Sequence, residues 1–158
     1  MRRLLLIFVA ALALCTSIAG PVATSQAAST NHLVVGMGTV SLGSPYGSPT
    51  LSVLAFQTGT RVTGGFVITY PADATYPAGR TAVIGTVTCL DVSGDIAYIT
   101  GLIAVSSGPR AGIFPVGDHI AIGVQAHEMN FSAGLSSGPC APEQSADIPL
   151  TAGSFIVR

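Results

Sequence analysis

The spacing of apolar and polar residues along the chain predicts β-strands. Short runs rich in Val, Ile, Thr and aromatic residues are separated at short intervals by segments rich in Gly, Pro and Ser, and no stretch keeps a helical period of 3.6 residues. This pattern is typical of an all-β protein with seven to eight strands. The runs that we expect to form strands are His32–Leu42, Thr50–Gln57, Val62–Tyr70, Thr81–Ser93, Ile96–Val105, His119–Phe131 and Leu150–Val157.

The longest of these runs, from Thr81 to Val105, predicts a β-hairpin at the centre of the fold. Gly94 and Asp95 form a two-residue loop between its arms, and glycine supplies the positive φ that a type II′ turn needs first. The turn sets the register of the two arms and therefore the face on which each side chain lies. The predicted core face pairs Val92 with Ala97, Leu90 with Ile99, Thr86 with Ile103, and Ile84 with Val105. The predicted mixed face pairs Val87 with Leu102, Cys89 with Thr100, and Asp91 with Tyr98.

Glycines interrupt both arms of this hairpin, at Gly85 and Gly101. A glycine inside a strand marks a bulge or a bend at a barrel corner, or it makes room for a neighbouring side chain. Sequential hairpins with such glycines favour an antiparallel meander closed as a small barrel, and a β-sandwich is the alternative. Closure suits a chain with few charged residues to guard an open sheet edge.

The N-terminus has the pattern of a secretory signal peptide. A basic start at Arg2 and Arg3 precedes an apolar run from Leu4 to Ala19, which is too short and too lightly flanked to predict a membrane span. We therefore expect residues 1–28 to be removed on export and residues 29–158 to form a single secreted domain without a transmembrane segment. The alternative is a lipid anchor through Cys15.

Charge is scarce in the expected mature domain. Four arginines stand against seven carboxylates, the chain contains no lysine, and the net charge after removal of the signal is about −3. Without a basic cluster, nucleic acid is not an expected partner. With 49% apolar residues, the chain has ample material for a core.

Two cysteines remain after the signal is removed, Cys89 and Cys140. In an oxidising compartment we expect them to form a disulfide. A reactive thiol is disfavoured because no C-x-x-C motif is present and no cation lies near Cys89 in the sequence.

The segment from Gly85 to Gly101 resembles a signature of uncharacterised small secreted actinobacterial β-proteins, G-x-V-x-C-L-x-V-x-G-x-x-A-x-x-x-G, with a second cysteine some 50 residues downstream. Cys140 matches that later cysteine. This resemblance implies export, a disulfide and a β fold, and it implies no activity. The matching positions within the signature are Gly85, Val87, Cys89, Leu90, Val92, Gly94, Ala97 and Gly101.

The residues that most suggest chemistry are His119 and His127, with Glu128 beside the second histidine. Eight residues apart on one strand, the two histidines would be about 26 Å apart and would not bind one metal ion. No zinc-protease, nucleophile-elbow or phosphate-loop motif occurs in the sequence. We therefore expect no catalytic residues, no metal site and no cofactor.

The favoured functional hypothesis is a secreted, non-catalytic β-domain that binds a small apolar ligand in its lumen or a partner at the cell surface. The alternatives are a structural cell-surface protein that associates through an uncharged outer face, and an extracellular hydrolase. A filled core with an exposed apolar patch would favour association. The aromatic residues that we predict to face a ligand are Phe56, Phe66, Tyr98 and Phe114.

Overall fold

The computed structural model describes residues 31–43, 47–126, 130–138, 140 and 148–158 of the 158-residue chain. Within these ranges eight strands and one short 3₁₀ helix follow one another. The strands begin and end close to where the apolar runs predict. They are β1 (Asn31–Val40), β2 (Thr50–Thr58), β3 (Arg61–Tyr70), β4 (Thr81–Ser93), β5 (Ile96–Ser107), β6 (His119–Gln125), β7 (Asn130–Leu135) and β8 (Leu150–Val157), with the 3₁₀ helix η1 (Ala111–Ile113) between β5 and β6.

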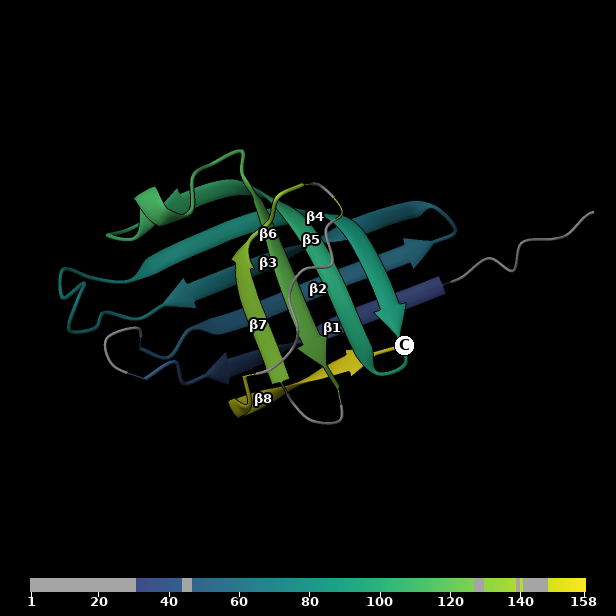
Figure 1. Cartoon of the computed structure of the whole chain (residues 1–158), viewed down its shortest axis with the longest axis horizontal. Helices are drawn as coiled ribbons and strands as arrows, with labels where there is room; N and C mark the ends of the chain where they lie inside the picture. Colours follow the sequence, from purple (N-terminus) through teal and green to yellow (C-terminus); the bar gives the residue numbers. More distant parts are fainter. Residues whose placement is uncertain (1–30, 44–46, 127–129, 139, 141–147) are drawn as a thin grey trace, which may run out of the picture.

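The eight strands form one antiparallel sheet that curls into a half-barrel. Its order is β7-β6-β5-β4-β3-β2-β1-β8, so consecutive strands are neighbours except β8, which returns to pair with β1. Strands β5, β6 and β7 cross in front of β1, β2 and β3, and β4 and β5 bend from one layer into the other (Figure 1). No ladder joins β7 to β8 in the described part of the chain. The predicted all-β antiparallel meander is confirmed, and the sheet that we expected to close as a small barrel curls into a half-barrel.

The central hairpin turns where predicted, but two bulges alter its register. Gly94 has a φ of 64°, and Leu90 pairs with Ile99 as expected. The register then shifts between Val87 and Cys89 and shifts back between Ile84 and Gly85, so that Ile84 pairs with Val105 as predicted. Between the two shifts the pairing is displaced by one residue.

These bulges overturn part of the predicted core face. We expected Thr86 and Ile84 to point into the core and Val87 to lie on the mixed face. Instead Val87 is buried, and Thr86 and Ile84 are exposed on the outside of the sheet, as is Val105. The cause is the period of two in a strand, since one inserted residue moves every later side chain to the opposite face.

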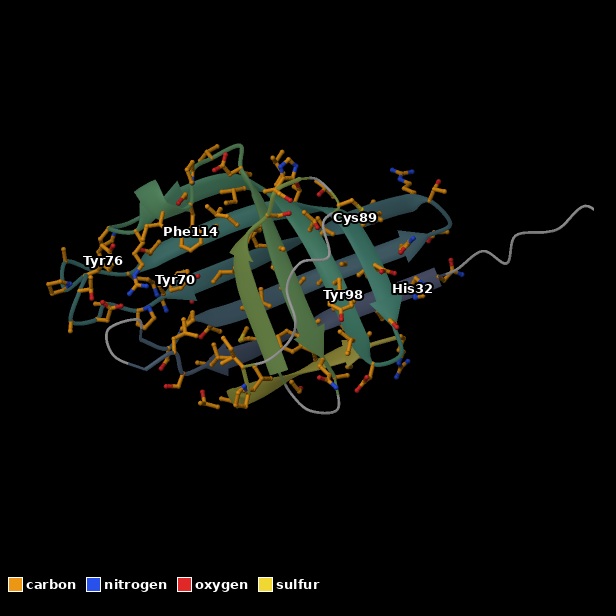
Figure 2. The ribbon with its side chains drawn as sticks, viewed as in Figure 1. His32, Tyr70, Tyr76, Cys89, Tyr98 and Phe114 are labelled. Carbon is orange, nitrogen blue, oxygen red and sulfur yellow. A yellow bond between two sulfur atoms is a disulfide. The ribbon has the colours of Figure 1, made fainter. Side chains whose placement is uncertain are left out.

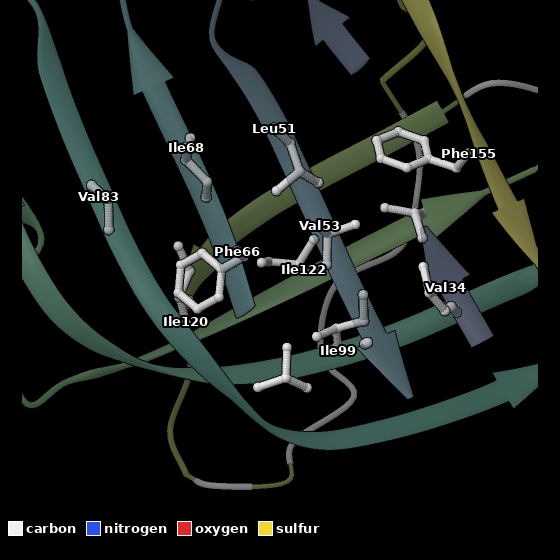
Figure 3. Close-up of a cluster of buried hydrophobic side chains, with 14 of the residues drawn as sticks. Val34, Leu51, Val53, Phe66, Ile68, Val83, Ile99, Ile120, Ile122 and Phe155 are labelled. Atoms are coloured by element: carbon white, nitrogen blue, oxygen red, sulfur yellow. The ribbon is translucent and has the colours of Figure 1, made fainter. Parts of the chain in front are cut away.

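The interior between the two layers is filled by apolar side chains. Figure 3 shows Phe66 and Ile68 of β3 packed with Ile120 and Ile122 of β6, which arrive from the crossing layer. The buried hydrophobic side chains are only 0–8% exposed. The inward face of the curled sheet is therefore a packed core.

Both mid-strand glycines of the hairpin make room for one aromatic ring. A Cβ at Gly85 or at Gly101 would fall well inside van der Waals contact of the Phe66 ring. On the same inward face, near the β8 edge of the sheet, Gly36 and Gly38 of β1 stand in the same relation to the ring of Phe155. Both Gly85 and Gly101 therefore make room for a neighbouring side chain, which is one of the two roles predicted for them. Gly85 also lies beside a register shift, as the other predicted role, a bulge, requires.

The segment His119–Phe131, predicted as one strand, is a hairpin. Gln125 of β6 pairs with Asn130 of β7, and the ladder continues to Ile120 opposite Leu135. A second correction concerns the 3₁₀ helix η1, which forms in a segment predicted as loop. The expected signal peptide, Cys15, His127 and Glu128 lie outside the described residues.

Candidate interaction surface

The outer face of the sheet carries two neighbouring rows of apolar side chains that run across six strands. In one row, Val35 pairs with Leu54 on one side and with Ile156 on the other, and the row continues through Gly65 and Thr86. In the next row, a ladder runs from Met37 through Ser52 and Val67 to Ile84. We call the apolar members of both rows the outer band, which consists of Val35, Met37, Leu54, Val67, Ile84, Leu102, Val105 and Ile156.

Much of this outer band is open to solvent. Met37, Leu54, Ile84, Val105 and Ile156 have exposed fractions of 40–56%. Single exposed apolar residues are ordinary on protein surfaces, but a contiguous patch on adjacent strands marks an interaction site. The outer band is continuous because its two rows adjoin on the same face of neighbouring strands, with only Ser52, Gly65 and Thr86 between some of its members.

A hollow lies in the middle of the outer band, over Gly65. A Cβ at this position would meet only the carbonyl oxygen of Gly85, at 3.2 Å, so the missing side chain leaves an open depression. The volume of this hollow is about 290 Å³, several times the roughly 30 Å³ that one water molecule occupies in the liquid. Leu54 and Ile84 stand as ridges beside it. The hollow is lined by Ser52, Val53, Leu54, Gly65, Phe66, Val67, Ile84 and Gly85.

The two rows of the outer band carry no formal charge. The exposed arginines nearest to them are Arg61, the first residue of β3, and Arg158, which follows β8 and pairs with Leu33 one row beyond Val35. The polar side chains between the apolar ones are Ser and Thr. The strand stretches that carry the band contain no Asp, Glu, Lys or Arg, and these are 33–39, 51–57, 63–69, 82–88, 102–105 and 154–157.

A buried ion pair joins two loops at one end of the half-barrel. Arg110, before η1, pairs with Asp73 of the loop between β3 and β4, and the side chains are 6% and 7% exposed. The guanidinium lies over the rings of Tyr70 and Tyr76, at 5.1 Å and 4.7 Å from their centroids. Tyr70 also stacks on Phe114, with ring centroids 5.4 Å apart. Figure 2 shows these three rings gathered at one end of the molecule.

The hydrogen bonds around this cluster indicate a structural role. The Asp73 carboxylate accepts hydrogen bonds from the backbone N–H groups of Thr75 and Tyr76, both at 2.9 Å, and the Thr81 hydroxyl accepts one from the backbone N–H of Arg110. Burial raises the pKa of Tyr70 to about 12, while the charge of Arg110 acts in the opposite direction. The guanidinium of Arg110 and the carboxylate of Asp73 thus pair with each other and hold their two loops together.

Cys89 and Cys140 lie at disulfide distance, with their Cα atoms 5.3 Å apart. The bond joins the outward side of β4 to the segment that follows β7. A hollow of about 220 Å³ lies beside it, lined by the two cysteines with Asp91, Tyr98 and Thr100. The arrangement pins the C-terminal part of the chain onto the central hairpin.

The structure does not bring the four predicted ligand-facing aromatic residues together. Phe66 is only 2% exposed within the core, and Phe114 belongs to the stack on Tyr70. Phe56 lies on the outer face, one row beyond Leu54, and is 44% exposed. Tyr98 borders the hollow at the disulfide, far from Tyr70 and Phe114 (Figure 2). Of the four, Phe56 is the one whose exposed side chain adjoins the outer band.

Among the described residues, the side chains that could bind a metal ion do not cluster. His119 is half-buried at the start of β6, in the position opposite Leu102. No group of three or more His, Cys, Asp or Glu side chains is placed to hold a metal within the described ranges. In that same part of the chain, no helix has the length and apolar character needed to span a membrane.

Comparisons with known protein families, with curated proteins and with solved structures found no match to this chain.

Proposed function

We propose that this chain is an exported, non-catalytic β-domain that works by binding a partner surface through the outer band. The observation that carries this proposal is a pair of facts about one sheet. Its inward face is filled, with buried apolar side chains at 0–8% exposure, while its outward face presents apolar residues at 40–56% exposure. A sheet that buries one apolar face in its own core and exposes another is suited to association.

Export is supported by the pattern of the N-terminus and by the cysteine pair. The basic start and apolar run precede the domain, and disulfides persist in oxidising compartments. The resemblance to secreted actinobacterial β-proteins points the same way. A small apolar ligand in the lumen is the weaker proposal, because the side chains of the crossing layers occupy that space.

Met37 offers a native reporter of whether the outer band is covered. Its thioether is 56% exposed in the isolated chain, and exposed methionines are readily oxidised to the sulfoxide. We would treat a suspension of expressing cells and a dilute sample of the protein purified from their medium with the same low concentration of peroxide. Mass spectrometry would then give the rate of Met37 oxidation in each. We expect slower oxidation in the cell suspension, where partners are present.

Two double variants make this test specific. Leu54→Thr with Ile84→Thr removes two ridges of the outer band and should restore fast oxidation of Met37. Ile113→Thr with Val116→Thr removes two apolar side chains that are at least as exposed, from the segment between β5 and β6, and should leave the protection unchanged. Equal oxidation rates in cells and in dilute solution for the unmodified chain would refute the proposal.

A further inference from the structure

We propose that the partner of the outer band is the outer band of a second copy of this chain, so that two half-barrels pack back to back. This inference rests on the proposed function and names its partner. The first argument is chemical. A partner with charged groups at the contact would have to bury them against strands that offer no counter-charge, which is costly. A second copy brings a surface equally free of charge.

The second argument is geometric, because the outer band is complementary to itself. Consider a two-fold axis that runs parallel to β2 and β3, midway between them, in the plane where the two outer faces meet. Leu54 and Gly65 are directly paired across this axis. The rotation therefore places Leu54 of each copy over the Gly65 hollow of the other, as an isologous contact requires.

The same axis matches other members of the outer band on the strands nearest to it. Met37 of one copy comes to lie over Ile84 of the other, because the two are equidistant from the axis within their row. Val35 comes over Thr86, whose methyl group is apolar. Two sheets packed with nearly aligned strands are a common arrangement, with the small angle between them set by sheet twist.

The available area is adequate for a stable dimer. The four strands nearest the axis lie about 4.8 Å apart and span about ten residues at about 3.3 Å per residue, which gives a footprint of about 600 Å². The accessible surface of corrugated side chains exceeds this flat footprint. Stable interfaces bury about 800 Å² per partner, so the outer face has the required size.

Analytical ultracentrifugation of the protein purified from culture medium tests the proposal directly. We expect a concentration-dependent mass of two chains. Gly65→Val fills the hollow, and Leu54→Thr removes the side chain that enters it, so each should raise the dimer dissociation constant at least about tenfold. Ile113→Thr is the matched control and should leave the constant unchanged. Circular dichroism would confirm that each variant keeps the β fold, and Leu54→Thr alone is decisive if Gly65→Val does not fold.

A charge exchange tests the specific two-fold axis. Leu54→Lys and Gly65→Glu should each be monomeric, because each would bury a charge without a partner. Mixed in equal amounts, they should form a heterodimer in which Lys at position 54 of one chain meets Glu at position 65 of the other. Failure of the mixture to associate, while the unmodified chain does so, would overturn this pairing.

These results separate the inference from the function on which it rests. A monomeric chain whose Met37 is nevertheless protected in cell suspension would overturn the second copy as partner and retain the outer band as a binding surface. A monomeric chain whose Met37 is unprotected would overturn both. Met37 protection that rises with protein concentration in purified samples would support the dimer.

Discussion

Replacement of Gly101 by alanine should destabilise the fold, although alanine is ordinarily better tolerated in a strand than glycine. An alanine Cβ at this position would fall inside van der Waals contact of the Phe66 ring and lie 2.9 Å from the carbonyl oxygen of Thr86. Phe66 is 2% exposed and surrounded by core side chains, so its ring has no space to turn away. Overpacking of this kind typically lowers the free energy of unfolding by about 1–3 kcal/mol, and for Gly101→Ala we expect a decrease of about 2–3 kcal/mol.

Urea unfolding followed by circular dichroism gives the free energies needed to test this. Gly112→Ala is the matched control, since no atom lies within 4 Å of the added Cβ, and it should change stability by less than about 1 kcal/mol. Phe66→Leu shortens the side chain that would clash. The double variant Gly101→Ala with Phe66→Leu should therefore lose about 1–2 kcal/mol less than the two single losses added together. If Gly101→Ala were as harmless as Gly112→Ala, or the two changes were simply additive, the ring-on-glycine account would be refuted.

Three further changes have defined outcomes. Cys140→Ser, which opens the link between residues 51 apart in sequence, should lower the free energy of unfolding by about 4 kcal/mol in urea titrations, and reduction of the native chain should have the same effect. Arg110→Met leaves Asp73 buried without its partner and should cost about 3–5 kcal/mol, part of which the double change with Asp73→Asn recovers in the same assay. Because burial raises the pKa of Tyr70 from 10 to about 12 in the folded chain, the contribution of Tyr70 to stability should be constant below pH 10 and fall by about 2–3 kcal/mol between pH 10 and 12. Tyr70→Phe should remove that fall.

The strands could be predicted from the sequence because their signals are local. β-branched runs bounded by Gly, Pro and Ser identify an extended backbone without any knowledge of the tertiary contacts. The Gly94 turn fixed the register next to it for the same reason, and Val92, Leu90 and their partners are paired as predicted. The cysteine pair could be predicted because only Cys89 and Cys140 lie outside the segment that we expect to be a signal peptide.

The bulges were not predictable from the same pattern. Thr86 and Val87 both suit a strand, and either is acceptable on a half-buried face, so local preference does not decide which one points inward. The contact that decides is the Phe66 ring over Gly85 and Gly101, which comes from a strand more than 15 residues away. The sequence showed the glycines but not the ring that requires them.

The cluster around the buried ion pair was not predicted, because its members share no local sequence pattern. Asp73 and Arg110 lie in two different loops, and only the topology of the sheet brings them together. A long-range ion pair leaves no periodic signal in a single sequence.

The outer band did leave a signal, since Leu54, Val67 and Ile84 each stand at strand positions adjacent in sequence to buried apolar residues.

That signal connects the composition of the chain to its proposed association. Strands with one face toward water alternate apolar and polar residues, whereas strands buried on both faces are apolar at consecutive positions. β2, β3 and β4 are of the second kind at their centres, yet in the single chain only one of their faces is covered. The strand stretches that carry the outer band contain none of the charged residues, which make up 8% of the chain. The proposed dimer would supply a second cover for this face, because an identical sheet presents the same uncovered apolar face.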